Sequence, residues 1–481
     1  MTDYEPVIGL EIHVQLGTRT KMFCGCDLSF GDPPNTHTCP ICLGLPGSLP
    51  VTNERAIHYG LMIGLALGSE LAPRSIFHRK NYFYPDLPKG YQISQYDMPL
   101  ATAGLLEVPG GPLVRIHRAH LEEDAAKLIH LGESWRIHGS DASLVDFNRG
   151  GTPLVEIVTE PDLRGAAEAA EWARLLRETV RQLGVSDVNM EEGSLRVDAN
   201  VSVRPAGSEE LGTKTELKNM NSFRFLQRGV EAELARQHEL VEAGGTVEQE
   251  TLHFDPASGS LTSLRSKEEA HDYRYFPEPD LVPLVPTEEM LREARESLPE
   301  LPAARIERYE GIGVPADVAL TLATDPRTAG YFENVVEAAD GIEPRVLANW
   351  VTGELAAALR QAEVDGGAAD SRVSPEAMAA LVRMVGEKKI SHGSAKTVLA
   401  ALVLEGGDPE PIVEREGLAQ MSDSGELEAI VEKAMADNAD AVEKIREGNN
   451  KAIGAIVGAV MRETKGRADG GEVNRLIQEK L

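Results

Sequence analysis

Strict alternation of apolar and polar residues is the feature that most constrains how this chain can fold. Residues 10–16 read LEIHVQL, and residues 195–204 read LRVDANVSVR. A period of two predicts β-strands with one buried face and one polar face. The segments 154–160 and 213–218 add two further predicted strands. We therefore expect a sheet whose apolar face packs on the core and whose polar face carries the chemistry.

The polar faces predict a site for a divalent cation and phosphate groups. Same-face neighbours lie about 6.5–7 Å apart on a strand, so side chains from several strands can converge. Carboxylates with one imidazole suit Mg²⁺ or Mn²⁺, although a solvated sheet face is the usual meaning of alternation. No P-loop and no dinucleotide-binding glycine motif is present. The candidates are Glu11, His13, Glu156, Arg196, Asp198, Asn200, Glu216 and Lys218, with Glu122 and Glu123 in a further acidic run.

All four cysteines lie in one short stretch, as Cys24-x-Cys26 and Cys39-x-x-Cys42. Two close pairs of thiolates joined by a turn-rich loop suit a tetrahedral zinc ion. The alternative is a loop with four reduced, unliganded thiols. A site made of four thiolates has no open position, so we expect a structural zinc ion at residues 24–42.

The length and the helix-breaking segments predict three domains. A chain of 481 residues exceeds the size of one ordinary core. The proline-dense segment 272–286 cannot form a regular helix, and beyond it the pattern is helical and Ala-rich. Ser374 and Pro375, for example, predict a helix start. We expect an α+β domain at 1–290, an all-α domain at 291–406 and a final helical domain at 407–481.

The net charge of 48 − 77 = −29 argues weakly against binding to nucleic acid driven by phosphate attraction alone. We interpret the excess carboxylates as an adaptation to high salt, which screens that attraction. The sequence has no apolar run of membrane-spanning length and no apolar segment at its N-terminus. The cytoplasm is the expected location, and neither DNA nor a membrane is an expected partner.

Two segments concentrate the scarce cations. Residues 77–96 combine Arg79, Lys80 and Lys89 with aromatic side chains, which predicts either a docking site for a planar anion or a packed tyrosine-rich loop. Near the C-terminus, a helical stretch with small residues forms the most basic part of the chain. Its cations are Lys451, Arg462, Lys465 and Arg467.

Long motifs in a fixed order give the chain its resemblance to a known family. They lie at residues 9–16, 79–86, 89–97, 120–124, 193–200, 216–223 and 272–280. Together they resemble the GatB/GatE family of tRNA-dependent amidotransferase subunits, from about residue 4 to the C-terminus. Residues 250–280 leave no room for the synthetase-like domain inserted in the GatE branch, which favours the GatB branch.

The resemblance implies a glutamine-synthetase-like cradle, a helical domain and a YqeY-like tail that binds tRNA. It implies amidation of Glu on mischarged tRNA(Gln) or Asp on mischarged tRNA(Asn), through an acyl phosphate made with ATP and Mg²⁺. Ammonia would come from a GatA-type glutaminase subunit, in a heterotrimer completed by a small GatC-type subunit. The sequence itself contains no recognisable glutaminase motif. A non-catalytic, zinc-stabilised tRNA-binding module and a free-standing ammonia ligase remain alternatives.

The resemblance also assigns residues. It places Mg²⁺ on Glu11, His13 and Glu123, and Lys80 and Lys89 near the active site and the ammonia route. With the polar strands, we expect Glu156 as a further metal ligand and Asp198 as a catalytic residue. The expected nucleotide-binding residues are Glu216, Lys218, Asn200 and Arg196.

Overall fold

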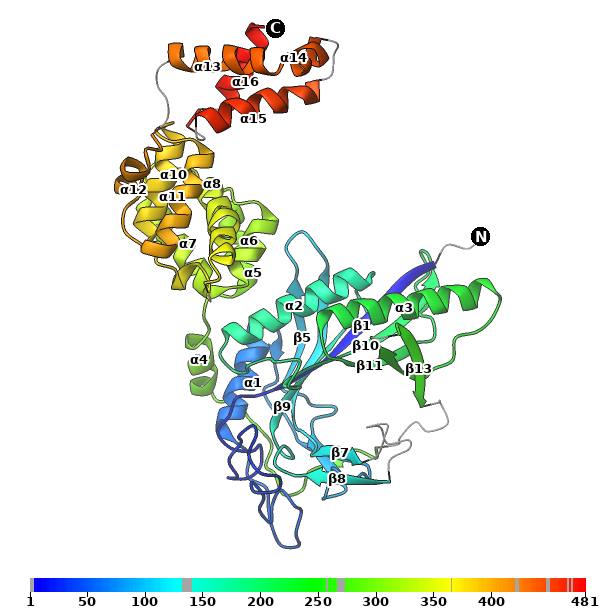
Figure 1. Ribbon diagram of the computed structural model, residues 1–481. Coiled ribbons are helices and arrows are strands. Elements are labelled where there is room, and N and C mark those ends of the chain that lie inside the picture. The colour runs from blue at the N-terminus through cyan, green and yellow to red at the C-terminus, as the bar shows by residue number, and fades with distance from the viewer. Residues whose placement is uncertain are drawn as a thin grey trace. The chain divides into compact units, whose positions relative to one another are not determined.

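The structure is a computed structural model. It describes residues 4–131, 141–256, 258–265, 273–364, 366–419, 424–446, 450–464, 467–468 and 470–481. The chain separates into two compact units, Met1–Ala304 and Arg305–Leu481 (Figure 1). The first unit combines helices with a large sheet, and the described part of the second is helical. This confirms the predicted α+β class with a helical remainder, whereas the three domain boundaries stay predictions.

A nine-stranded sheet forms the centre of the first unit. Its neighbouring strands are antiparallel except for one parallel pair, β11 with β12. Four of the strands coincide with the alternating segments of the sequence. In spatial order the strands are β13 (Ser260–Arg265), β12 (Thr251–Asp255), β11 (Thr215–Met220), β10 (Leu195–Pro205), β1 (Tyr4–Gln15), β9 (Pro153–Thr159), β6 (Leu113–Glu123), β5 (Ala101–Glu107) and β2 (Glu70–Leu71).

The apolar face of this sheet packs against helices α1 (Glu54–Ala66), α2 (Ala166–Gln182) and α3 (Phe223–Glu242). In Figure 1, α2 and α3 lie side by side over the strands. Leu10, Ile12 and Val14 of β1 are buried there, because the period of two turns them all to one side. Trp172 of α2 is fully buried, and its indole N–H donates to the carbonyl of Leu106 at 3.0 Å. The polar residues of β1 therefore face the other way.

A small sheet of β14 (Phe276–Pro277), β3 (His78–Asn81) and β4 (Tyr91–Ser94) brings distant parts of the chain together. Its order places β14, from the proline-dense segment, beside β3. Arg79 joins the two strands, because its guanidinium donates to the buried carboxylate of Glu278 at 2.6 and 2.8 Å. A hairpin of β7 (Lys127–Leu131) and β8 (Ala142–Asp146) completes the β-structure.

Helix α4 (Glu288–Glu296) packs on α1 in the first unit, and the predicted boundary at residue 290 falls inside it.

In the second unit α10 begins at Pro375, and the Ser374 hydroxyl accepts a hydrogen bond from the Ala377 N–H, as the sequence predicts. Two separate apolar clusters lie within Ile306–Leu418 and Leu427–Leu481. The remaining helices are α5 (Pro302–Gly311), α6 (Ala316–Ala323), α7 (Pro326–Ala338), α8 (Pro344–Asn349), a π-helix (Trp350–Leu355), α9 (Ala356–Gln361), α10 (Pro375–Gly386), α11 (His392–Glu405), α12 (Pro409–Glu416), α13 (Ser424–Asp437), α14 (Ala439–Arg446), α15 (Ile453–Glu463) and α16 (Gly470–Glu479), with short 3₁₀ turns at Ala368–Asp370 and Asn450–Ala452.

None of the helices in the described ranges is both long and apolar enough to cross a membrane.

Candidate active site

One row of polar side chains crosses the four central strands of the large sheet. The strand register pairs Arg196 with His13, His13 with Glu156, and Glu156 with His120. The next row pairs Glu11 with Asp198. Because directly paired residues share a face, the antiparallel register brings these side chains together from four strands.

His13 lies at the centre of a group of carboxylates. Its Nε2 atom is 3.6 Å from Glu11 Oε1, 3.5 Å from Glu156 Oε2 and 3.9 Å from Glu122 Oε1. Two sets have ligand atoms within 4.8 Å of one another, namely Glu11 with His13 and Asp198, and His13 with Glu122 and Glu156. Oxygen ligands with one imidazole fit Mg²⁺ or Mn²⁺.

The charges of this group favour a bound cation. Burial lowers the pKa of His13, but Glu156 and Glu122 outweigh that effect and raise it to about 9. Burial raises the pKa of Glu156, but His120 and His13 reverse the shift, so the pKa lies below its usual value. For Glu11, burial and the nearby Glu156 raise the pKa. Positive charge at this point therefore stabilises carboxylates that otherwise repel one another.

Two lysines, Lys80 and Lys218, line a cavity over this face of the large sheet. Burial lowers the pKa of Lys80, but Glu122 outweighs it and the pKa rises; its Nζ atom lies 4.9 Å from the centre of the Tyr273 ring. The Lys218 Nζ atom lies 3.1 Å from Asp198 Oδ2 and 2.9 Å from Glu216 Oε1. A cavity of about 510 Å³ is lined by both lysines, by Glu11, Arg118, His120, Glu156, Glu216 and Thr251, and by Ser94, Gln95, Tyr96, Tyr273 and Tyr275. It lies between the large sheet and the small one.

Two predicted nucleotide-binding residues do not line this cavity. The Arg196 guanidinium donates to Asp124 Oδ1 at 3.0 Å, and Gln15 donates to the same carboxylate at 2.6 Å. Arg196 therefore already has an anionic partner in the sheet. Asn200 is paired with Gly9 on β1 and with Glu216 on β11.

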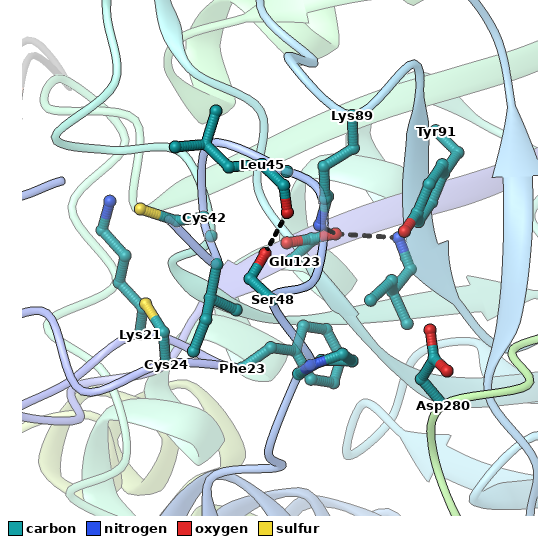
Figure 2. Close-up of a pocket in the computed structure, with 15 residues that line it drawn as sticks. Lys21, Phe23, Cys24, Cys42, Leu45, Ser48, Lys89, Tyr91, Glu123 and Asp280 are labelled. Carbon is teal, nitrogen blue, oxygen red and sulfur yellow. Dashed lines mark hydrogen bonds and ion pairs between the residues drawn. The ribbon is translucent and has the colours of Figure 1, made fainter. Parts of the chain in front are cut away.

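Glu123 and Lys89 line a different cavity from Glu11 and Lys80, whereas His13 and Asp198 line neither of the two. They form a close ion pair, with side chains only 5% and 9% exposed, and the Ile93 N–H donates to Glu123 Oε1 at 2.9 Å. Figure 2 shows both residues at a small cavity that Cys24 and Cys42 also line. Neither metal-ligand set of the described residues contains Glu123.

Glu122 lies beside His13, where the sequence analysis expected Glu123. Successive side chains of β6 point to opposite faces, so only one of these two glutamates can join His13. Pairing of Glu156 with His120 selects Glu122, two residues further along the same face. His120 is a residue of this group that sequence reasoning did not single out. It is 3% exposed, and its Nε2 atom is 3.7 Å from both Glu122 and Glu156. The sequence did contain a signal, since the alternation of residues 118–123 between the two faces of the strand places His120 and Glu122 on the same face.

The four cysteines form a compact cluster. Their sulfur atoms lie within 4.8 Å of one another, and the Cys39 N–H donates to the Cys42 sulfur at 3.2 Å. Four thiols at this separation fit a tetrahedral zinc ion, which needs four soft ligands. The fully buried Lys21 lies beside them and donates to the carbonyl of Phe147 at 2.9 Å.

The cations predicted near the C-terminus lie in the second unit. Lys451 and Arg462 are exposed, and the half-buried Arg467 donates to the carbonyl of Thr464 at 3.1 Å. Lys465 lies outside the described residues.

Comparison with known proteins agrees with this geometry. The family model of the GatB/GatE catalytic domain matches residues 6–292, and that of the GatB domain matches residues 330–481. Curated relatives named as the B subunit of aspartyl/glutamyl-tRNA(Asn/Gln) amidotransferase match over almost the whole chain. The protein of Syntrophotalea carbinolica is 48% identical over 99% of this chain and 98% of its own length, and that of Geotalea uraniireducens is 50% identical over 99% of each. The relative from Geobacter sulfurreducens is 50% identical over 100% of this chain and 99% of its own length. The chain therefore belongs to the GatB/GatE family, among the B subunits of the aspartyl/glutamyl-tRNA(Asn/Gln) amidotransferases.

Proposed function

We propose that this chain activates the side-chain carboxylate of Glu on mischarged tRNA(Gln), or of Asp on mischarged tRNA(Asn), for conversion to the amide. The single observation that carries the proposal is a cavity lined by carboxylates, by His120 and by two lysines, next to two possible sets of metal ligands that share His13. A carboxylate is a poor electrophile at neutral pH, so amide formation needs an acyl phosphate. Phosphoryl transfer depends on charge neutralisation and alignment more than on covalent help.

The residues that line the cavity and the buried ligands beside it bind and align the reacting groups. Glu11, His13, Glu122 and Glu156 would hold Mg²⁺, which supplies positive charge beside the phosphates of ATP. Lys80 and Lys218 would donate to phosphate oxygens. The γ-phosphoryl group passes from ATP to the substrate carboxylate, and ADP leaves. Ammonia then attacks the acyl carbon, phosphate leaves, and the surplus proton of the ammonia nitrogen passes to a base.

Ammonia would come from a glutaminase partner of the GatA type, within a heterotrimer that includes a GatC-type subunit. The names of the relatives describe one of several subunits of an amidotransferase, which supports a complex of this kind. Lys89 and Glu123 belong to this proposal as polar groups that exchange protons beside the ammonia route. Zinc on Cys24, Cys26, Cys39 and Cys42 is proposed as structural. A tRNA-binding role of the tail, a cytoplasmic location and adaptation to high salt also stay predictions.

The alternative function is a zinc-stabilised tRNA-binding module without catalysis. Buried carboxylates speak against it, because a surface that only binds tRNA has no use for negative charge. Glu122 and Glu156 are 2% and 5% exposed and lie beside the same imidazole. Burial of two such groups is costly unless positive charge compensates it, and His13 and His120 beside them supply part of that charge.

An assay of amide formation tests the proposal. The chain would be combined with its partner subunits, ATP, Mg²⁺, glutamine and Glu-tRNA(Gln) or Asp-tRNA(Asn). We expect His13→Ala to abolish amide formation and to spare glutamine hydrolysis by the partner. His130→Ala is the matched control, since this histidine of β7 contacts Ser143 at 2.8 Å, away from the cavity. Equal amide yields from the two variants would support the non-catalytic alternative.

A further inference from the structure

The turn between Cys39 and Ser48 forms one wall of the small cavity that contains the Lys89–Glu123 ion pair (Figure 2). This cavity of about 70 Å³ is lined by Cys24 and Cys42 of the thiol cluster as well as by the ion pair. The cluster and the pair therefore border one enclosed space.

Gly44 is the point at which this turn touches Lys89. Its φ of +68° lies in the left-handed region, and a Cβ atom at this position would lie 2.5 Å from Lys89 Cγ and 3.1 Å from Lys89 Cα. Because the Cα atom is also close, rotation of the lysine side chain alone cannot remove the clash. Only glycine satisfies both the backbone conformation and the contact.

Backbone hydrogen bonds within the turn connect Gly44 and its neighbours to the segment that carries Cys39 and Cys42; the Leu43 N–H, for example, donates to the carbonyl of Cys39 at 3.1 Å. The Gly44 N–H donates to the carbonyl of Ile41 at 3.0 Å, and the Leu45 N–H donates to that of Pro40 at 2.8 Å. Cys39 and Cys42 are joined within the same turn by the N–H to sulfur contact at 3.2 Å. A displacement of Cys42 therefore displaces Gly44.

We propose that the thiol-bearing turn is a positioning element, which holds Lys89 against Glu123 through Gly44 and is itself held by metal on the four thiols. Gly44 lies against the stem of Lys89, whereas the Lys89 Nζ atom pairs with the Glu123 carboxylate and lies 5.4 Å from the centre of the Tyr91 ring. The consequence for amide formation rests on the proposed function. The position of Lys89 does not depend on the proposed function, and it can be measured separately from amide formation.

The test compares two glycine variants of the zinc-loaded full chain. Gly44→Ala introduces both backbone strain and the clash with Lys89. Gly47→Ala introduces similar strain at φ +86°, but nothing lies within 4 Å of its added Cβ. The readout is labelling of Lys89 by an amine-reactive ester, followed by peptide mass spectrometry. We expect labelling to accelerate about tenfold in Gly44→Ala only, because an overpacked contact displaces the buried side chain. Equal labelling rates in the two variants would overturn the proposal.

Removal of zinc from the unmodified chain provides a second arm, which holds even if Gly44→Ala does not fold. A chelator should raise Lys89 labelling, and added zinc should restore protection. Lys218, on β11 of the large sheet, serves as the internal reference and should keep its labelling rate. Unchanged Lys89 labelling, or a parallel rise at Lys218 that reflects loosening of the whole unit, would each contradict local coupling. Wild-type chain that makes no amide but shows both labelling effects would refute the proposed function and leave this inference intact.

Discussion

Glu122→Gln should weaken binding of a divalent cation, whereas Glu123→Gln should leave it almost unchanged. The two residues are adjacent in β6 and similarly buried, at 2% and 4% exposure. Glu122 Oε1 lies 3.9 Å from His13 Nε2, and Glu123 pairs instead with Lys89. The two variants remove the same charge from neighbouring positions. A difference in cation affinity between them therefore reports which face of β6 carries the cation ligand.

The separation of Glu122 and His13 sets the magnitude. A cation held between Glu122 and His13 would lie no farther from the Glu122 oxygen than His13 Nε2 does, and opposite unit charges 3.9 Å apart attract by about 4 kcal/mol at an effective dielectric constant of about 20. Glutamine keeps an oxygen ligand, and loss of Glu122 also removes one group that raises the pKa of His13, which makes the neutral imidazole easier to form. We therefore expect a net loss of about half that energy, which is about 30-fold in the dissociation constant.

Mn²⁺ is a suitable probe, because the resonance of the free ion in electron paramagnetic spectra reports binding directly. Titrations of wild type and both variants at one pH and one ionic strength give the dissociation constants, and circular dichroism checks that each variant is folded. Equal weakening by both substitutions, or a larger effect of Glu123→Gln, would refute the assignment of faces.

Two further predictions concern stability. Glu278→Ala leaves Arg79 without its buried partner, so the free energy of unfolding in urea should fall by about 3 kcal/mol. Glu296→Ala is the control, because Glu296 forms an exposed pair with Arg292 and its loss should not change the free energy of unfolding. Similar values for the two variants would contradict the argument. Burial raises the pKa of Asp124, but Arg196 and Arg149 outweigh it, so the folded-state pKa lies below the ordinary 3.8. The stability from this depressed pKa is present above 3.8 and is lost as the pH falls through the folded value. The free energy of unfolding should therefore fall less steeply with decreasing pH for Asp124→Asn than for wild type. Parallel curves for the two proteins would contradict a depressed pKa of Asp124.

The period of two in the sequence was sufficient to predict the central strands. Residues 10–16 and 195–204 correspond to β1 and β10, with bounds Tyr4–Gln15 and Leu195–Pro205. Alternation identifies the polar side of each strand from local sequence alone, because it reflects burial of the other side. It also placed Glu11, His13, Glu156 and Asp198 on polar faces, where the structure brings them together.

The partners across strands could not be predicted in the same way. Pairing of Glu156 with both His13 and His120 depends on the order β1, β9, β6, which is a property of the whole sheet. The approach of Glu278 to Arg79 spans 199 residues, and no local pattern encodes such a contact. The proximity of Glu122 rather than Glu123 to His13 was hard to predict for a different reason, since the alternation of β6 was readable but its partner strand was unknown.

The end of β6 separates two cavities of different chemistry, and β4 reinforces the separation. Ser94 lines the large cavity and its hydroxyl donates to Glu122 at 3.0 Å, whereas Glu123 lines the small cavity and accepts a hydrogen bond from the Ile93 N–H at 2.9 Å. Two adjacent residues of one strand thus meet two adjacent residues of another, with one pair on each side. The carboxylates that would hold a cation and the ion pair beside the thiol cluster therefore lie on opposite faces of one stretch of paired backbone. Among the described residues, none that lines one of the two cavities also lines the other.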